Sequence, residues 1–215
     1  MNILVLNGSP KGNYSITLQT VLYLEKLNPG HKFEVLNVGS QIRSYEKDFT
    51  PAFEALKRAD LILFSYPVYT FIAPSQLHRF MELIKTSGLD FSQKFATQIT
   101  TSKHFYDITA HKYIQENCQD LKIKFIKGLS ADMDDLLTPK GQKDALNFFN
   151  YVCWCMGNDI YEAFPEPHGP SVHIPVTPVG NSPGKPGNVV IVTDLDNEDT
   201  QLENMINRFM GKLPL

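Results

Sequence analysis

The residues with the clearest chemical potential lie in a short polar loop near the start of the chain, residues 7–15. The loop reads Asn-Gly-Ser-Pro-Lys-Gly-Asn-Tyr-Ser. An apolar run over residues 2–6 precedes it and predicts a buried strand, and residues 16–24 follow with apolar side chains at helical spacing. Gly8 and Gly12 allow backbone amides to approach a ligand closely, and Lys11 adds a cation. A strand, a polar loop and a helix N-terminus in this order predict an anion site, most directly one for phosphate.

The loop differs from the two common phosphate motifs. It lacks the Gly-Lys-Ser/Thr end of a P-loop and the Gly-x-Gly-x-x-Gly spacing of a dinucleotide fingerprint. Its composition alone is equally compatible with an ordinary turn rich in small polar residues. The loop therefore indicates an anion site only in combination with its place in the fold.

Two other groups of residues could do chemistry, but a plainer explanation fits each of them better. Cys153 and Cys155 lack the Cys-x-x-Cys spacing and stand in an apolar helical stretch, so we expect them to be core residues. Asp132, Asp134 and Asp135 have no further ligands at a recognisable spacing, so we expect a solvated acidic loop. No metal site is predicted.

Four histidines lie where a role at or near the site is conceivable from the sequence, namely His78, His104, His168 and His173. His104 follows a predicted strand, where it is expected either to contact a ligand or to be an ordinary surface residue. His78 is expected to be structural. His168 and His173 lie in a proline-rich stretch that could cover the site.

The elements that must position these residues alternate between strands and helices. Strands are predicted at residues 2–6, 33–37, 61–65, 95–101 and 123–126. Helices are predicted at residues 16–24, 51–58, 74–85, 106–118 and 138–156, the last capped by Thr138. This rhythm predicts a doubly wound α/β fold with five parallel strands, for which the flavodoxin-like order 2-1-3-4-5 is expected. Ligands bind such sheets at the carboxyl ends of the strands, which is where the loop at residues 7–15 falls.

The composition changes after residue 160. Residues 164–187 hold seven prolines and four glycines, which predicts an extended linker or strap. A strand at residues 189–192 and a helix at residues 199–210 are predicted to follow. We therefore expect a binding domain at residues 1–160, a linker or strap at 161–187 and a strand-helix extension at 188–215. The extension either packs on the main domain or begins a second, truncated domain.

Charge and composition exclude several classes of protein. A net charge of −3 over 215 residues gives no basic surface for nucleic acid. No apolar run is long enough to span a membrane, and no secretory signal is visible. Three cysteines do not suggest a disulfide framework, so a cytoplasmic location is expected.

Two motifs resemble those of the NAD(P)H-dependent FMN reductase family, which has a flavodoxin-like fold. The first is the loop itself, which is similar to the family's FMN-phosphate loop, roughly Gly-Ser-Pro-Arg/Lys-x-x-Asn-Ser/Thr. The second runs from Ala59 to Phe80 and is similar to a strand that ends in a Pro-x-Tyr loop beside the flavin ring, followed by a helix. The resemblance spans about residues 1–155. Related iron–sulfur flavoproteins carry clustered cysteines after the second strand, but residues 41–48 contain none, so no cluster is expected.

The resemblance implies bound FMN, with NAD(P)H as co-substrate. It places the phosphate on the loop after the first strand and the ring against the loops after the third and fourth strands, near Lys103. The cofactor-binding residues that it implies are Ser9, Lys11, Gly12, Asn13, Tyr14, Ser15, Pro67, Val68, Tyr69, Thr70, Thr101, Ser102 and His104. Pro67 and Tyr69 offer flat apolar surface, and Thr101 and Ser102 offer donors for the polar edge of the ring.

The resulting hypothesis is an enzyme that passes electrons from a nicotinamide through FMN to a quinone, a flavin or another acceptor. No catalytic side chain is predicted, because the cofactor carries the chemistry. The alternatives are a non-enzymatic flavodoxin-like electron carrier, a flavin-binding domain of a larger redox protein, and an interaction module that no longer binds flavin. The expected partners are a small-molecule acceptor and further copies of this chain, in a homodimer or homotetramer.

Overall fold

The structure is a computed structural model, and it describes residues 1–104, 106–164, 190–193 and 200–212. Contacts divide the chain into two units, residues 1–166 and residues 167–215. The first unit contains the sheet and every element that positions the loop at residues 7–15.

The first unit is built on a parallel sheet in the order β2-β1-β3-β4-β5, as predicted. Its five principal strands are β1 (Asn2–Asn7), β2 (Lys32–Leu36), β3 (Leu61–Pro67), β4 (Phe95–Thr101) and β5 (Lys124–Phe125). Strands β1 and β3 lie in the middle of the sheet and are apolar along most of their length, because both faces are covered.

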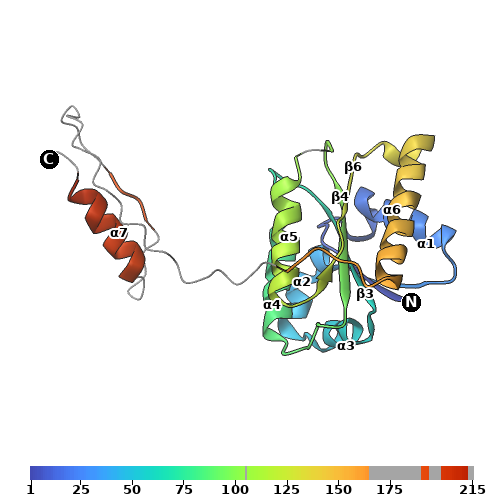
Figure 1. Cartoon of the computed structure of the whole chain (residues 1–215), viewed down its shortest axis with the longest axis horizontal. Coiled ribbons are helices and arrows are strands. Elements are labelled where there is room, and N and C mark those ends of the chain that lie inside the picture. The colour runs from blue at the N-terminus through green and yellow to red at the C-terminus, as the bar shows by residue number, and fades with distance from the viewer. Residues whose placement is uncertain (105, 165–189, 194–199, 213–215) are drawn as a thin grey trace. The chain divides into compact units, whose positions relative to one another are not determined.

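Helices cover both faces of the sheet (Figure 1). Leu4 and Leu6 of β1 pack with α2 (Val38–Lys47), α3 (Thr50–Arg58), α4 (Ser75–Thr86) and α5 (Ile108–Asp120). Ile3 and Val5 point to the opposite face and pack with α1 (Ile16–Leu27) and α6 (Pro139–Gly157). The alternation follows from the two-residue period of a strand, and it yields two apolar cores around one sheet.

The predicted fifth strand is the clearest departure from expectation. Instead of one strand at residues 123–126, two short segments pair in turn with β4: β5, and then β6 (Leu129–Ala131). Ala96 pairs with Phe125 and Ile99 with Leu129, so three steps along β4 match four along the partner. The chain between β5 and β6 therefore holds one residue more than the matching part of β4, as at a β-bulge.

The observed helix bounds lie within a few residues of the predicted ones. One helix, α2, has no counterpart among the predicted helices. Thr138 caps α6, since its side chain accepts a hydrogen bond from the Gly141 amide, as predicted. Two short 3₁₀ segments, Gly12–Tyr14 and Asp135–Leu137, lie in loops. Helix α2 was not predicted; Gln41, with φ of −119°, interrupts it and breaks its periodicity.

The second unit contains α7 (Thr200–Met210), close to the predicted helix at residues 199–210. Residues 190–192, the described part of the predicted strand at 189–192, are not in a strand. Residues 165–187 of the proline-rich segment, with His168 and His173, lie outside the described residues. Within the described ranges, no helix is both long enough and apolar enough to cross a membrane.

Candidate functional site

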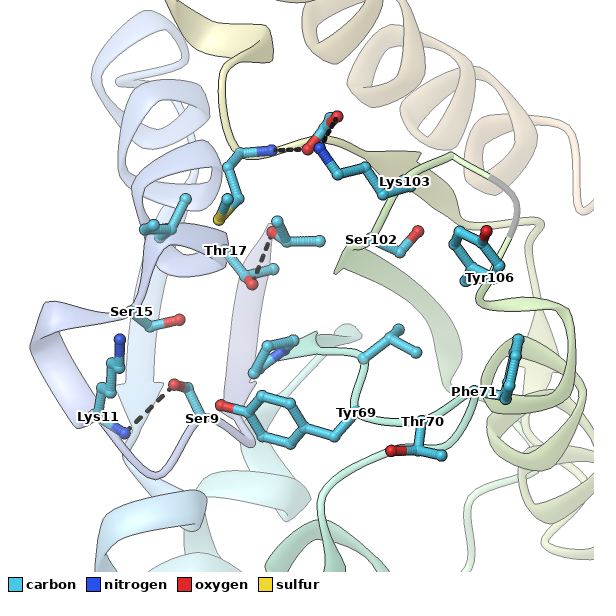
Figure 2. A pocket seen from close by; sticks show the side chains of 16 residues that line it. Ser9, Lys11, Ser15, Thr17, Tyr69, Thr70, Phe71, Ser102, Lys103 and Tyr106 are labelled. Carbon is cyan, nitrogen blue, oxygen red and sulfur yellow. Dashed lines mark hydrogen bonds and ion pairs between the residues drawn. The ribbon is translucent and has the colours of Figure 1, made fainter.

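A cavity of about 470 Å³ opens at the carboxyl edge of the sheet, where the loops after β1, β3, β4 and β6 meet (Figure 2). This volume is in the range of sites that bind small molecules and cofactors. The cavity is lined by Ser9, Lys11, Ser15, Ile16, Thr17, Pro67, Val68, Tyr69, Thr70, Phe71, Thr101, Ser102, Lys103, Tyr106, Asp132 and Met133.

Asn7, the last residue of β1, organises the loop that follows it. Its side chain is fully buried, and Nδ2 donates to the carbonyl oxygen of Gly12 and to Oδ1 of Asn37, both at 2.9 Å. Its Oδ1 accepts from the Ser9 amide at 3.2 Å. Asn37 in turn donates to Oδ1 of Asn13 at 2.8 Å. These bonds fix the loop before any ligand arrives.

Two glycines allow the close packing beneath the loop. Gly12 has φ of +54°, a conformation that costs other residues strain. Gly39 lies near the start of α2, where a Cβ would stand 2.3 Å from the carbonyl carbon of Ser9 and 2.4 Å from the carbonyl oxygen of Gly8. No side chain fits at that position, so α2 supports the loop backbone directly.

One end of the cavity is suited to an anion. Ser9 Oγ accepts from the Lys11 amide at 3.3 Å, which leaves its hydroxyl proton for a ligand. Ser15 caps α1 by accepting from the Leu18 amide. Ile16 and Thr17 begin α1 and both line the cavity, and the first amides of a helix have no partner within it. With the helix dipole and Lys11, these groups form a positive, donor-rich end.

The opposite end of the cavity is aromatic. Residues 69–72 form a tight turn in which the Tyr69 and Ile72 amides each donate to the other residue's carbonyl, at 3.0 and 3.1 Å. Thr70 and Phe71 have φ of 50° and 72°, a strained region for residues with side chains. The Phe71 ring stands 5.6 Å from that of Tyr106. Figure 2 shows Phe71 and Tyr106 across the cavity from Lys11 and Ser15.

Polar groups join these two ends. Thr17 Oγ1 lies 2.8 Å from Thr101 Oγ1, so the start of α1 is tied to the end of β4. The Ser102 amide donates to the carbonyl oxygen of Ala131 at 2.8 Å, while Ser102 Oγ is buried with no hydrogen-bond partner among the described residues. Lys103 Nζ lies 3.6 Å from Asp132 Oδ2. The unpartnered Ser102 hydroxyl is a donor that a bound ligand can satisfy.

The structure brings most of the predicted site residues together. Ser9, Lys11, Ser15, Pro67, Val68, Tyr69, Thr70, Thr101 and Ser102 line the cavity, as does Lys103. Gly12, Asn13 and Tyr14 do not line it. Gly12 and Asn13 are held by Asn7 and Asn37 on the supporting side, and Tyr14 is 89% exposed.

His104 also lies outside this cavity. Its φ of 63° turns the side chain toward the start of α6, where Nδ1 is 3.3 Å from the Ser130 carbonyl oxygen and Nε2 is 3.5 Å from Asp135 Oδ1. There it lines a separate cavity of about 80 Å³.

Several residues that line the cavity were not predicted from the sequence. They are Ile16, Thr17, Phe71, Tyr106, Asp132 and Met133. The available signal was position in the sequence. Ile16, Thr17, Phe71 and Tyr106 lie within two residues of predicted site residues, and Asp132 and Met133 come immediately after β6. Asp132 was expected in a solvated acidic loop; it directly follows β6, and its side chain also lines the cavity. Among the described residues, no cluster of His, Cys, Asp or Glu side chains is arranged to hold a metal.

Comparison with known families and structures points to one fold. A family model described as flavodoxin-like fold matches residues 1–149. No curated protein sequence matches the chain.

Three solved structures illustrate the structural similarity. RosB with a bound intermediate, 8-demethyl-8-formylriboflavin-5′-phosphate, shares 13% identity, covers 90% of this chain and 100% of its own, and has a TM-score of 0.57. An FMN-dependent NADH-azoreductase from Bacillus anthracis, in complex with FMN, shares 14% identity over 70% of this chain and 98% of its own, with a TM-score of 0.51. The NAD(P)H:quinone oxidoreductase from Methanothermobacter marburgensis shares 13% identity over 76% and 98%, with a TM-score of 0.53.

At sequence identities this low, the structural similarity shows a shared fold and nothing more.

Proposed function

This chain belongs to the flavodoxin-like fold family, and from that premise we propose that it is an FMN-dependent oxidoreductase. It takes electrons from NADH or NADPH and passes them to a small-molecule acceptor such as a quinone or a flavin. The observation that carries the proposal is a single cavity at the carboxyl edge of the sheet, with an anion-binding end and an aromatic end. FMN, with a phosphate at one end and a flat ring at the other, would bind with its phosphate at the anion end and its ring extending toward the aromatic end.

The anion end holds the phosphate. Ser9 and Ser15 contribute hydroxyls, Lys11 contributes a positive charge, and the first amides of α1 contribute donors. Charge-assisted hydrogen bonds of this kind are about twice as strong as neutral ones. Because Asn7 and Gly39 already fix the loop, little ordering cost remains when the phosphate binds.

The ring lies along Pro67, Val68 and Tyr69, whose side chains line the cavity after β3. Thr101 and Ser102, after β4, stand where they donate to its polar edge. Ser102 Oγ suits this role because it is buried and has no partner among the residues described. Bound FMN supplies the hydride and electron transfer, so the protein needs only to place it and shape its surroundings.

The aromatic end receives the nicotinamide and the acceptor. Tyr69, Phe71 and Tyr106 give it flat, partly exposed surfaces, and Lys103 and Asp132 lie nearby. Stacking against such rings suits planar acceptors of several kinds. No side chain is assigned a role in proton transfer.

We extend the proposal to assembly as a homodimer or homotetramer. Four exposed large side chains line the cavity, namely Tyr69, Phe71, Tyr106 and Met133. Ile72, also exposed, belongs to the same turn as Tyr69. Large exposed apolar patches mark interaction sites, and soluble oligomers are mostly symmetric copies of one chain. Light scattering coupled to gel filtration measures the mass, and a monomer at all concentrations would remove this part of the proposal.

An absorbance experiment tests the main proposal. The protein is incubated with FMN, desalted, and mixed without oxygen with NADPH and then with NADH. A retained yellow chromophore that a nicotinamide bleaches supports the oxidoreductase. Retained flavin that neither nicotinamide reduces favours an electron carrier, and a colourless protein rejects the FMN site.

The match to RosB raises a second candidate, because it extends over most of this chain and all of RosB. That structure holds a modified riboflavin 5′-phosphate described as an intermediate. In this alternative the flavin phosphate is itself the reactant and not a resident cofactor. Mass spectrometry of the flavin recovered after incubation separates the two, since a resident cofactor is recovered unchanged.

A further inference from the structure

A buried polar cluster lies beside the cavity and takes no part in lining it. It consists of Thr100, Asp107 and His111, and none of the three lines the 470 Å³ cavity. Thr100 is the residue before Thr101 near the end of β4, so its side chain points to the opposite face of the sheet. Asp107 stands just before α5. Between them the chain carries Ser102, Lys103 and Tyr106, which do line the cavity.

The two ends of this loop are joined by one short hydrogen bond. Thr100 Oγ1 donates to Asp107 Oδ2 at 2.6 Å. Thr100 is fully buried and Asp107 is only 4% exposed, so water does not compete for this bond. A loop whose ends are tied together has fewer conformations available to its middle.

His111 supports the same bond from α5. Its Nε2 lies 2.8 Å from Thr100 Oγ1 and 3.3 Å from Asp107 Oδ2. Because the Thr100 hydroxyl proton goes to Asp107, the proton between Thr100 and His111 is on His Nε2.

The backbone of His111 is also anchored to the sheet. Its carbonyl oxygen accepts from Gln98 Nε2 at 3.1 Å, and Gln98 Oε1 accepts from the Tyr66 hydroxyl at 2.6 Å. The cluster is therefore fixed to both β3 and β4.

The carboxylate of Asp107 stays charged despite its burial. Burial alone would raise its pKa, but hydrogen bonds to the carboxylate, first of all from His111, hold the pKa well below its usual range. A buried charge is costly unless its partners stay in place. The buried charge of Asp107 therefore favours the one arrangement in which Thr100 and His111 keep their hydrogen bonds to it.

We propose that Thr100, Asp107 and His111 are positioning residues that hold the loop after β4 closed at its base, so that Ser102 and Tyr106 stand ready at the cavity. The effect on FMN binding rests on the proposed function, whereas the effect on loop order does not. Without the closed base, binding has to order the loop, and affinity falls by that ordering cost.

The test compares Thr100→Val with Thr100→Ser. Valine keeps the shape and removes the hydroxyl, while serine keeps the hydroxyl. Val152→Ala, in the core of α6 on the other face of the sheet, serves as a control of general destabilisation. Asp107→Asn is a second variant in case the valine variant does not fold.

Two readouts are measured for each variant. The first is amide hydrogen exchange in flavin-free protein for peptides covering residues 101–107 and, as an internal reference, residues 8–15. The second is the dissociation constant of FMN from flavin fluorescence. For Thr100→Val we expect exchange in the first peptide to accelerate by about tenfold, the effect of losing one buried hydrogen bond, with no change in the second peptide. We expect the FMN dissociation constant to rise by about the same factor.

For Thr100→Ser, the exchange rate of residues 101–107 and the FMN dissociation constant should remain within about twofold of the wild-type values. Val152→Ala should not accelerate amide exchange in residues 101–107 more than elsewhere. If Thr100→Val or Asp107→Asn lowers stability while the loop exchanges as in wild type, the cluster is only part of the core and the proposal is wrong. If the wild-type protein binds no FMN but Thr100→Val accelerates exchange in residues 101–107 as expected, the positioning role stands and the FMN proposal fails.

Discussion

The two ends of the cavity are built in opposite ways. At the anion end, Ser9 is 2% exposed, and its loop is held by the side-chain amides of Asn7 and Asn37 and by a helix packed directly against the backbone. At the aromatic end, Phe71 is 52% exposed in a turn with positive φ, held by two backbone hydrogen bonds and a ring contact. The first end is formed before a ligand arrives, and the second has room to adapt.

Under the proposed function, this difference indicates that the two ends of the cavity have different roles in binding. A preformed anion end supplies affinity for one constant group, because little entropy is lost on binding. An adaptable aromatic end can bind planar ligands of different shape, with a smaller loss of affinity for each ligand that fits imperfectly. The predictions that follow test whether the two ends separate in this way.

The largest effect is expected from Gly39→Ala. The new Cβ would meet backbone atoms of Gly8 and Ser9 at 2.3 to 2.4 Å, and backbone cannot move aside as a side chain can. We expect a loss of about 3 kcal/mol in the free energy of unfolding, near the upper end for overpacking, and loss of FMN binding. Thermal unfolding and flavin titration measure both. Gly30→Ala is the matched control, since its Cβ would meet nothing within 4 Å; equal stability of the two variants would contradict a preformed anion end.

Next in size is Asp107→Asn, on the side of the aromatic end. Because the folded pKa of Asp107 lies below its unfolded value of about 3.9, its charge stabilises the protein above that pH, and the contribution is lost as pH falls. We expect the variant to lose about 2 kcal/mol at neutral pH, the range for a hydrogen bond to a charged group. The loss should shrink between about pH 5 and pH 2. Denaturant unfolding at several pH values measures it, and a loss that stays constant over this range would be inconsistent with a depressed pKa.

A smaller effect is expected from Lys11→Ala, which should act on ligand affinity and not on stability. Lys11 is exposed, so the unfolding free energy should change by less than about 0.5 kcal/mol. The FMN dissociation constant should rise by about tenfold, and high salt should reduce the difference because it screens exposed charges. Lys112→Ala, an exposed lysine of α5, is the control. Equal losses in both variants would mean that the loop is not where the phosphate binds.

The smallest effect is expected from Thr70→Gly at the strained turn. Glycine adopts φ of 50° without the steric cost that a β-branched residue meets there. Relief of that strain, less the entropy cost of glycine, should raise the free energy of unfolding by about 0.5 kcal/mol. Chemical denaturation measures the change. A clear destabilisation would show that Thr70 makes contacts that outweigh the strain.

The sequence was most informative where a residue's role follows from its neighbours in the chain. The apolar runs at β1 and β3 predicted the buried centre of the sheet, and the loop composition predicted the anion end. Thr138 was identified as a cap because threonine is a preferred N-cap residue and stands at the start of the predicted helix, as the structure confirms.

The sequence was less informative where a role depends on distant chain segments. Asp132 lines the cavity because it follows β6, a short strand that was not predicted separately. Tyr106 comes near Phe71 because two loops meet in space. His104 was placed at the ring by its position in the loop, but its backbone conformation turns it away. The positions of these three side chains depend on loop geometry, which side-chain patterns do not encode.

The most direct test of the central claim is a titration of the flavin-free protein with FMN and with riboflavin under identical conditions, following flavin fluorescence. The two ligands differ only in the phosphate. If the anion end supplies the affinity, FMN should bind about a hundredfold more tightly, the sum of a few charge-assisted hydrogen bonds, and Lys11→Ala should narrow the gap. Equal affinities for the two flavins would contradict the account, because the loop at residues 7–15 would then not be the phosphate site.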